Sequence, residues 1–324
     1  MDIDPAGCPA GTPSIPDSPA PESPFPESPF PDNTAGTDGS APLRGVAQWL
    51  RCPHCAAVTA AAPLSVSGRT LMCSSAHRFD IARHGHVSML HGRRRHHGDD
   101  PAMVAARERF LGRDHYRPLR STITALVAEH APPRTRLVAD LAGGTGHYLS
   151  PVLDALPNAH GLVVDASTSS LRRAARAHPR AAALGADLVG QLPLADGVVD
   201  VALSVFGPRP AREIDRVLRA DGIVVVATAR TGHLSELRSR LGLLGIDPRK
   251  AERLREGFTA FDVIDEQSVG WRLALDHHEV EDLVAMGPSA RHLDPAGLQE
   301  AIGRLPDVVA VTAAMSATVL RRCR

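Results

Sequence analysis

The sequence predicts an α/β protein in which a small metal-binding module precedes a parallel sheet with helices on both faces. Three observations predict this fold. Strand-like and helix-like segments alternate from residue 137 onward, a glycine-rich turn at residues 140–146 follows the first strand, and three cysteines and a histidine between residues 52 and 77 are spaced as C-x2-C and C-x3-H. Alternating elements of this kind form a parallel sheet, because right-handed crossovers return the chain to the same sheet.

The alternation is read from the period of the apolar residues. Strands are expected at residues 137–141, 160–164, 182–185, 199–205 and 223–228, with helices at 148–156, 168–178, 210–219 and 233–244. Apolar residues at helical spacing also predict two helices within residues 101–130. The rest of the chain predicts an amphipathic helix at 277–286 and a late strand at 308–319.

The length of 324 residues, 43% of them hydrophobic, is more than one domain of about 100 to 200 residues needs. Residues 1–44 hold 11 of the 27 prolines and lack apolar periodicity, so we expect a disordered tail that is dispensable for chemistry. The metal-binding module is expected at residues 45–97 and the main domain at 98–324.

No run of about 18 apolar residues and no secretion signal is readable, which predicts a cytoplasmic protein without a membrane span.

The module carries four candidate ligands for zinc, namely Cys52, Cys55, Cys73 and His77. Two short segments that each offer two nitrogen or sulfur ligands close a tetrahedral shell, and in so small a unit metal binding supplies much of the folding free energy. Free cysteines in a loop are the alternative interpretation. His54 and His84 are possible substitute ligands, but the C-x3-H spacing favours His77.

The charged residues point to arginine-based recognition of anions. Net charge is zero and Lys250 is the only lysine, so an anion site would be built mainly from arginine, although GC-rich coding bias explains the same skew. The basic run at residues 83–97 indicates solvated surface when taken alone, whereas its place between the module and the main domain favours contact with phosphates. Aromatic content of 3% argues against a platform that stacks several bases.

The glycine-rich turn predicts a nucleoside-cofactor site. Glycines at 143, 144 and 146 let the backbone approach a ligand closely, and Asp165 ends the second strand, where a carboxylate accepts both ribose hydroxyls. This pattern suits NAD, FAD or S-adenosylmethionine, but the dinucleotide spacing G-x-G-x-x-G is not met. Asp140 favours a cationic ligand, as S-adenosylmethionine is. The later Asp187 and Asp200 support a binding site over a purely structural turn.

A series of motifs in order along the chain resembles the RlmA family of 23S rRNA guanine-N1 methyltransferases, from about residue 50 to the end. The matching segments are Cys52-Pro-His-Cys55, Cys73-x3-His77-Arg-Phe79-Asp80, Gly85-x-Val87, Gly98-Asp99, Phe110-Leu-x3-His115-Tyr116-x-Pro118-Leu119, Asp140-Leu-x2-Gly144-Thr-Gly146-x-Tyr148 and Gly232-His233-Leu234-x-Glu236-Leu237. Such a series is far more specific than a glycine-rich loop alone.

The resemblance implies a Rossmann-like, S-adenosylmethionine-dependent methyltransferase domain at 98–324 and a zinc-binding, RNA-recognition domain at 45–97. The implied reaction is methylation of N1 of a guanine in a domain II hairpin loop of 23S rRNA, and the family includes the tylosin and mycinamicin resistance enzymes. By motif match, zinc would be held by the four ligands already named, and Tyr116, Gly144, Thr145, Asp165 and His233 would surround the cofactor, beside Asp140 and Gly146.

Several positions depart from the family pattern. Ala142 stands where the common methyltransferase turn has glycine, so the turn and its cofactor affinity are expected to differ. After the fourth strand, Phe206-Gly207-Pro208 replaces a more usual aromatic-Ala/Ser-Pro. Residues 93–97 replace a segment richer in lysine, and the proline-rich tail has no counterpart in the family.

The chemistry requires an unpaired or flipped-out guanine, because N1 lies in its Watson–Crick edge. We expect residues 204–209 to form the base pocket at the carboxyl edge of the sheet. No general base is identifiable; His233 and His147 are candidates by side-chain chemistry alone. A small-molecule methyltransferase and a non-catalytic zinc RNA-binding protein are the alternative functions. The sequence leaves the oligomeric state open, a homodimer included.

Overall fold

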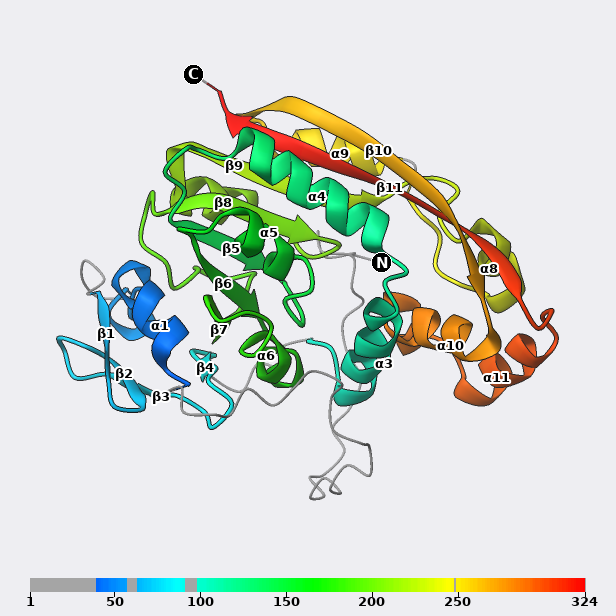
Figure 1. Cartoon of the computed structure of the whole chain (residues 1–324), viewed down its shortest axis with the longest axis horizontal. Helices are drawn as coiled ribbons and strands as arrows, with labels where there is room; N and C mark the ends of the chain where they lie inside the picture. Colours follow the sequence, from blue (N-terminus) through cyan, green and yellow to red (C-terminus); the bar gives the residue numbers. More distant parts are fainter. Residues whose placement is uncertain (1–38, 57–62, 91–97, 248, 324) are drawn as a thin grey trace, which may run out of the picture. The chain divides into compact units, whose positions relative to one another are not determined.

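Four parallel strands form the centre of an eight-stranded sheet, as the sequence predicts (Figure 1). In this computed structural model, which describes residues 39–56, 63–90, 98–247 and 249–323, they are β5 (Leu137–Leu141), β6 (His160–Asp165), β7 (Ala181–Gly185) and β8 (Val199–Val205). β9 (Leu218–Ala229) pairs with β8 in parallel and begins earlier than expected. Every side chain of β5, β7 and β8 is buried, because both faces of the sheet are covered.

The predicted parallel sheet is extended at one edge by two antiparallel strands, so the sheet as a whole is mixed. β11 (Val309–Arg322) is the predicted late strand, but it pairs antiparallel with β9, from Met315 opposite Ala229 to Arg321 opposite Ile223. β10 (Phe261–Leu275) was not predicted and pairs antiparallel with β11. Nine of the fifteen residues of β10 are exposed, as expected for an edge strand that takes its hydrogen bonds from one neighbour. Apolar residues nevertheless recur at every second position from Val269 to Leu275, with Leu273 and Leu275 buried, so a strand signal was present and was missed.

Helices cover the two faces of the sheet as two separate hydrophobic clusters. One cluster is formed with α3 (Pro101–Gly112), α4 (Arg117–His130), α5 (Leu149–Ala155), α6 (Thr168–Ala174), α8 (Ser235–Leu241), α10 (His277–Ala285) and α11 (Pro295–Gly303). The other is formed with α1 (Ala41–Val46), α7 (Ala211–Val217), α9 (Lys250–Gly257) and the metal-binding module. Figure 1 shows α4 and α9 on opposite sides of the sheet. The predicted helices are confirmed, with shorter ends than expected.

The metal-binding module is built from short elements. They are η1 (Ala47–Trp49), α2 (Pro53–Ala56), β1 (Leu64–Ser67), β2 (Thr70–Cys73) and β3 (Arg78–Asp80), with the three strands in one antiparallel sheet. The second ligand pair lies on the predicted hairpin between β2 and β3. The first pair lies at the short helix α2 instead of on a hairpin.

The module packs directly against the main sheet. Leu50 forms a β-bridge with Leu194, and β4 (Val87–Ser88) adds a parallel edge strand beside β7. The Met89 backbone N–H donates to the carbonyl of Gly185 at 2.7 Å. A Cβ on Gly45 of α1 would lie 2.5 Å from the His160 ring, so this glycine allows the helix to approach β6 closely. The module and the sheet therefore share one hydrophobic cluster.

Two predictions fall partly outside the described residues. The tail predicted at 1–44 is contradicted at its end, because α1 begins at Ala41 and buries Leu43; residues 1–38 lie outside the described residues. Of the basic run at 83–97, residues 83–90 are described and include the strand β4, whereas 91–97 are not. Among the described helices, none is long and apolar enough to cross a membrane.

Candidate metal centre and cofactor site

The four predicted metal ligands meet at one point of the N-terminal module. Nδ1 of His77 lies 3.5 Å from Sγ of Cys52, 3.3 Å from Sγ of Cys55 and 3.4 Å from Sγ of Cys73. The sulfurs of Cys55 and Cys73 are 3.8 Å apart. All three cysteines are buried, and His77 is half-buried. Residues that are 25 positions apart in sequence thus present one nitrogen and three sulfurs to a common centre.

These distances fit a tetrahedral zinc ion. Zinc bonds of about 2.3 Å to sulfur and about 2.0 to 2.1 Å to nitrogen place two sulfurs about 3.8 Å apart and a sulfur and a nitrogen about 3.6 Å apart. His54 does not contribute to this cluster; its ring stacks on Phe79 with centroids 5.7 Å apart. His84 also lies outside it, which leaves His77 as the fourth ligand that the geometry favours.

The cofactor turn leaves β5 through two backbone positions that favour glycine. Gly144 and Gly146 have φ of +56° and +81°, in the left-handed region that residues with a Cβ rarely adopt. A Cβ on Gly143 would lie 2.6 Å from the carboxyl group of Asp140. Thr145 lies between these two glycines and is half-buried. The three predicted glycines therefore let the turn pass close to Asp140.

Asp140 is a buried carboxyl group without a partner. Its side chain is 0% exposed, and neither oxygen has a hydrogen-bond partner among the described residues. Burial, and secondarily the charge of Asp165, raise the pKa of Asp140 to about 8. A carboxyl group in this state is costly unless a ligand supplies a cation or a hydrogen-bond donor. Asp140 therefore marks a place for the positively charged part of a cofactor.

Asp165 is held in place by the backbone at the end of β6. Oδ2 accepts from the Gly144 N–H at 2.9 Å and Oδ1 accepts from the Ser167 N–H at 2.7 Å. Burial raises the pKa of this carboxyl group despite these two bonds. Because a carboxylate has about four acceptor positions, both oxygens keep capacity for a pair of ribose hydroxyls.

Two predicted aromatic residues join the same site from opposite ends of the domain. Tyr116, at the start of α4, and His233, after β9, have ring centroids 6.5 Å apart. Tyr148 lies beside them: burial raises its pKa, as does the neighbouring phenol of Tyr116. All the predicted cofactor residues therefore lie at the carboxyl edge of the sheet or in the helix that covers it. Their contact with a cofactor stays a prediction.

The two candidate general bases, His233 and His147, both have a lowered pKa. Burial, followed by the charges of Arg238 and Lys250, lowers the pKa of His233 to about 4. Burial and the charge of Arg120 lower the pKa of His147 to about 4 as well. Both imidazoles are neutral at pH 7, and neither would retain a proton taken from a substrate.

Asp99 and Arg107 cover the cofactor turn and were missed as site residues. Arg107 Nη1 donates to Asp99 Oδ2, lies 3.3 Å from the Cβ position of Gly144, and its Nη2 donates to the carbonyl of Met286 at 2.8 Å. The Ser167 hydroxyl donates to the Asp99 carbonyl at 2.5 Å. The Gly98-Asp99 motif was the available signal for this contact, whereas Arg107, inside a helix, gave none.

Asp200 was wrongly associated with the cofactor site. It is the second residue of β8, and its Oδ2 accepts from the backbone N–H groups of Arg136 and Leu137, both at 2.9 Å. Arg219 pairs with its Oδ1 at 3.2 Å. Asp200 thus fixes the amino edge of the sheet, at the end opposite to the cofactor turn. Asp187 does follow β7, where its Oδ1 accepts from the Val189 N–H at 2.9 Å.

Two departures from the family pattern compensate each other. Ala142 adopts φ of +56°, and a Cβ on Gly207 would lie 2.6 Å from the Cβ of Ala142 and 3.3 Å from the Leu141 carbonyl. An alanine in the turn therefore requires a glycine after β8, whereas a glycine in the turn leaves room for the more usual alanine or serine. The altered turn is accommodated without loss of the site.

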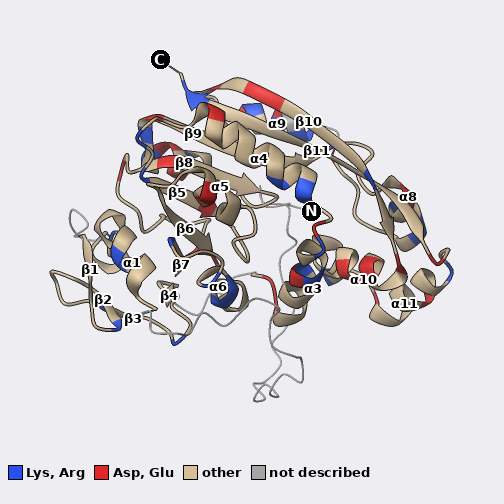
Figure 2. Ribbon diagram, viewed as in Figure 1, with Lys and Arg blue, Asp and Glu red and all other residues tan. Residues whose placement is uncertain are grey.

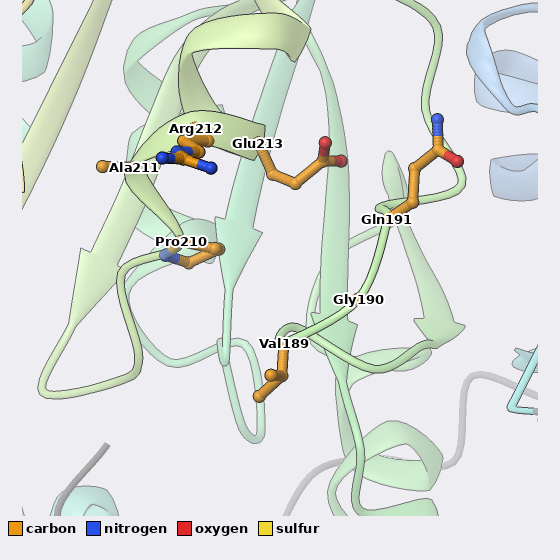
Figure 3. A pocket seen from close by; sticks show the side chains of 7 residues that line it. All are labelled: Val189, Gly190, Gln191, Pro210, Ala211, Arg212 and Glu213. Carbon is orange, nitrogen blue, oxygen red and sulfur yellow. The ribbon is translucent and has the colours of Figure 1, made fainter. Parts of the chain in front are cut away.

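A shallow cavity of about 480 Å³ lies outside the cofactor turn. Its walls are the loop after β7 and the beginning of α7 (Figure 3), with the lining residues Val189, Gly190, Gln191, Pro210, Ala211, Arg212 and Glu213. None of the predicted cofactor or metal residues lines it. Its position next to residues 204–209 makes it part of the surface beside the expected base pocket.

The fold and the two sites define the class of the protein. A three-cysteine, one-histidine module is packed on a Rossmann-like sheet, and the first turn of the sheet lies beside two buried aspartates, Asp140 and Asp165. This combination is that of an S-adenosylmethionine-dependent methyltransferase domain with an N-terminal zinc-binding domain.

Comparisons with known proteins identify the family. Residues 50–96 match the family model described as "RlmA, N-terminal". A putative 23S rRNA (guanine-N1) methyltransferase of Micromonospora griseorubida is 45% identical over 82% of this chain and 95% of its own length. The 23S rRNA (guanine(748)-N1)-methyltransferase of Streptomyces fradiae is 42% identical over 86% and 98%. A Bacillus subtilis protein named as a putative enzyme of the same kind is 30% identical over 59% and 68%. The chain belongs to the RlmA-type family of 23S rRNA (guanine-N1) methyltransferases, which confirms the resemblance seen in its motifs.

Proposed function

We propose that this protein transfers a methyl group from S-adenosylmethionine to N1 of a guanine in 23S rRNA. The target proposed is a guanine in a domain II hairpin loop, with guanine 748, named for the Streptomyces fradiae relative, as the candidate nucleotide. The proposed consequence is resistance to macrolides of the tylosin and mycinamicin type. Family membership supports the substrate, and the structure supports the cofactor.

The observation that carries the cofactor assignment is the orphaned carboxyl group of Asp140. When bound, S-adenosylmethionine supplies a methyl group made electrophilic by its sulfonium. Asp140 would accept from the ammonium group of the cofactor, and Asp165 would accept from its ribose hydroxyls. The turn around Gly144 would lie against the ligand. These roles match the cationic and hydroxyl ends of this cofactor better than a pyrophosphate, because an anion would not favour ionisation of Asp140 and would be repelled by the carboxylate of Asp165.

The guanine is proposed to enter beside Phe206. This residue begins the turn after β8, has φ of +60° and is 45% exposed. A bulky residue in the left-handed region is strained, and such strain persists where the surrounding structure enforces it, often at functional sites. An exposed ring next to the cofactor turn offers a stacking face for a flipped base. N1 must come within about 3 to 3.5 Å of the methyl carbon for the displacement to occur.

The N1 proton is proposed to leave without a dedicated side-chain base. His233 is neutral at pH 7, so it can accept a hydrogen bond but cannot hold the proton. Its imidazole is placed by the Ala314 N–H, which lies 3.3 Å from Nδ1. We therefore assign His233 a positioning role near the cofactor and the proton to water.

The zinc module is proposed to hold the hairpin. It carries the family's zinc-ribbon segment and is packed on the side of the sheet that includes α7. A module whose fold depends on zinc would lose RNA binding with the metal.

Primer extension on 23S rRNA tests the proposal, because a methyl group on N1 blocks base pairing and stops reverse transcriptase. Cells that carry the gene should give a stop in the domain II loop, cells without it should give none, and cells with Asp140→Asn should give a weaker stop than the parent. Growth in the presence of tylosin should be best in cells with the parent gene, weaker in cells with Asp140→Asn and poorest in cells without the gene. Methyl label appearing only in a metabolite extract would favour a small-molecule enzyme, and absence of S-adenosylmethionine binding by calorimetry would favour a non-catalytic RNA-binding protein.

A further inference from the structure

Arg209 and Lys250 are two half-buried cations that lack a structural partner. Neither side chain makes a hydrogen bond or a salt bridge within the part of the chain that the structure describes, and both are of intermediate exposure. The nearby carboxylate of Asp247 pairs with Arg253 at 3.1 Å. Other half-buried arginines differ: Arg216, for example, pairs with Glu213 and Asp196 at 2.6 Å each.

The fold brings these two residues to the same edge of the sheet. Arg209 lies just before α7, and Lys250 is the first residue of α9. Both helices cover the same face, since Ile214 and Val217 of α7 belong to one hydrophobic cluster with Leu254 of α9. Figure 2 shows basic residues along α9. Arg209 also follows the strained Phe206 by three residues, so the cations lie beside the proposed position of the base.

The electrostatic environment agrees with a cluster of excess positive charge. Burial lowers the pKa of Lys250, the neighbouring Arg209 lowers it further, and the carboxylate of Asp247 offsets only part of this. Burial alone lowers the pKa of Arg209. Lys250 in turn acts on His233, which borders the cofactor site. Two desolvated cations that repel each other are costly for the free protein, and an anion placed between them would remove that cost.

We propose that Arg209 and Lys250 together bind one phosphate of the RNA backbone next to the target guanosine. The inference rests on the proposed function, because it takes the base to lie at Phe206. The arginine offers a fork that matches two phosphate oxygens, and the lysine offers a compact charge to a third. Lys250, the only lysine of the chain, thus helps to hold the RNA backbone in place while the target base turns toward the cofactor.

The experiment measures RNA affinity of the zinc-loaded full chain as a function of salt. The probe is a transcript of the 23S rRNA domain II hairpin, titrated in a series of KCl concentrations. The variants are Lys250→Met, Arg209→Met, the double variant, Lys250→Arg, and Arg134→Met as a control. Arg134 is exposed, lies before β5 at the opposite edge of the sheet, and has no hydrogen bond or salt bridge to other described residues.

The expected result is a smaller salt dependence for each single variant. Loss of one phosphate contact should lower the slope of log K against log salt by about 0.7 to 1. Lys250→Arg and Arg134→Met should keep the parent slope. The double variant should lose less affinity than the product of the single losses, because one shared phosphate can be lost only once. Melting temperatures should not fall, since removal of either cation relieves repulsion.

Several results would overturn the phosphate site. Parent slopes in both single variants would do so, as would multiplicative losses in the double variant, which indicate two separate phosphates. Unchanged RNA binding with a shifted pH profile of methylation would place the cations on the guanine itself. A parent protein that binds the transcript with the expected slopes but never methylates it would contradict the proposed function alone.

Discussion

The metal centre and the cofactor site are built to bind their ligands in different ways. The metal centre uses four side chains within one short stretch, residues 52–77, whose donor atoms all lie within 4.8 Å of one another. The cofactor site draws on residues from Asp99 to His233 and depends on backbone N–H groups, glycine conformations and one carboxyl group without a partner. The metal centre can be recognised from the sequence, because its ligands are close together and characteristically spaced. The cofactor site is brought together only when the chain folds.

The largest effect is expected from breaking the metal centre. Cys73→Ser should remove zinc and with it much of the folding free energy of the module, since structural zinc contributes on the order of 10 kcal/mol or more. RNA binding should be abolished, while the dissociation constant for S-adenosylmethionine should stay within about threefold because its residues lie elsewhere. Metal analysis, RNA binding and calorimetry measure the three quantities.

Cys323→Ser is the matched control, because Cys323 is exposed and lies outside the cluster. It should retain zinc and both binding activities. Loss of cofactor binding in Cys73→Ser would mean that the shared hydrophobic cluster makes the module and the sheet one folding unit, and that the two sites are not independent.

The next effect separates two buried aspartates at opposite edges of the sheet. Asp140→Asn should weaken S-adenosylmethionine binding roughly 10- to 150-fold, from loss of a hydrogen bond to a charged group worth about 1.5 to 3 kcal/mol. The melting temperature should not fall, because the variant removes a carboxyl group without a partner. Asp200→Asn should lower the melting temperature and leave the affinity for S-adenosylmethionine unchanged, since it weakens the hydrogen bonds to the backbone N–H groups of Arg136 and Leu137. Equal cofactor affinity in Asp140→Asn and the parent would remove Asp140 from the site.

The pH dependence of cofactor binding should come from the same residue. The pKa of Asp140 in the free protein is about 8, so the group is mainly protonated at pH 7. A cationic ligand favours the ionised form, and binding must therefore release a proton below pH 8. Affinity should rise with pH, by at most about tenfold per unit, and level off above about pH 8. Calorimetry at pH 7 in two buffers with different ionisation enthalpies should detect this proton, and should detect none from this residue in Asp140→Asn.

The smallest effects are expected at the compensating pair of the turn. Ala142→Gly should stabilise the protein by about 1 kcal/mol, because it relieves a left-handed alanine. Gly207→Ala alone should cost about 1 to 3 kcal/mol from overpacking against Ala142. In the double variant that cost should largely disappear, giving a coupling energy that a double-mutant cycle of thermal unfolding measures. Strictly additive effects would show that the two positions do not share the space.

The sequence predicts the parts of the molecule in which a local pattern and a buried environment coincide. The parallel strands β5 to β8 are buried on both faces and read as apolar runs, and the four metal ligands are separated by short, characteristic spacings. β10 was missed because most of its residues are exposed and the polar stretch at residues 265–268 interrupts its apolar pattern, although its backbone pairs with β11 from Phe261 to Leu275.

The cofactor site was predictable only in part for the same reason. Asp140, Asp165 and the glycines lie at strand ends, where a turn signal marks them. Arg107 reaches the turn from α3, and although its partner Asp99 is only eight residues before it, its other partner, Met286, lies 179 residues away. Asp200 shows the opposite error: it was counted among aspartates that follow a strand, but it is the second residue of β8 and therefore lies at the amino edge of the sheet.

The central claim is that a zinc-pinned module and an S-adenosylmethionine site in one chain act together on a guanine of 23S rRNA. Mass spectrometry of nucleosides from a domain II transcript, incubated with the purified, zinc-loaded protein and S-adenosylmethionine, tests it most directly. The account predicts one N1-methylguanosine per transcript, and much less with Asp140→Asn when the S-adenosylmethionine concentration is near the dissociation constant of the parent protein. A zinc-loaded protein that binds S-adenosylmethionine but leaves every guanine unmodified, or methylates a different position of the base, would contradict it.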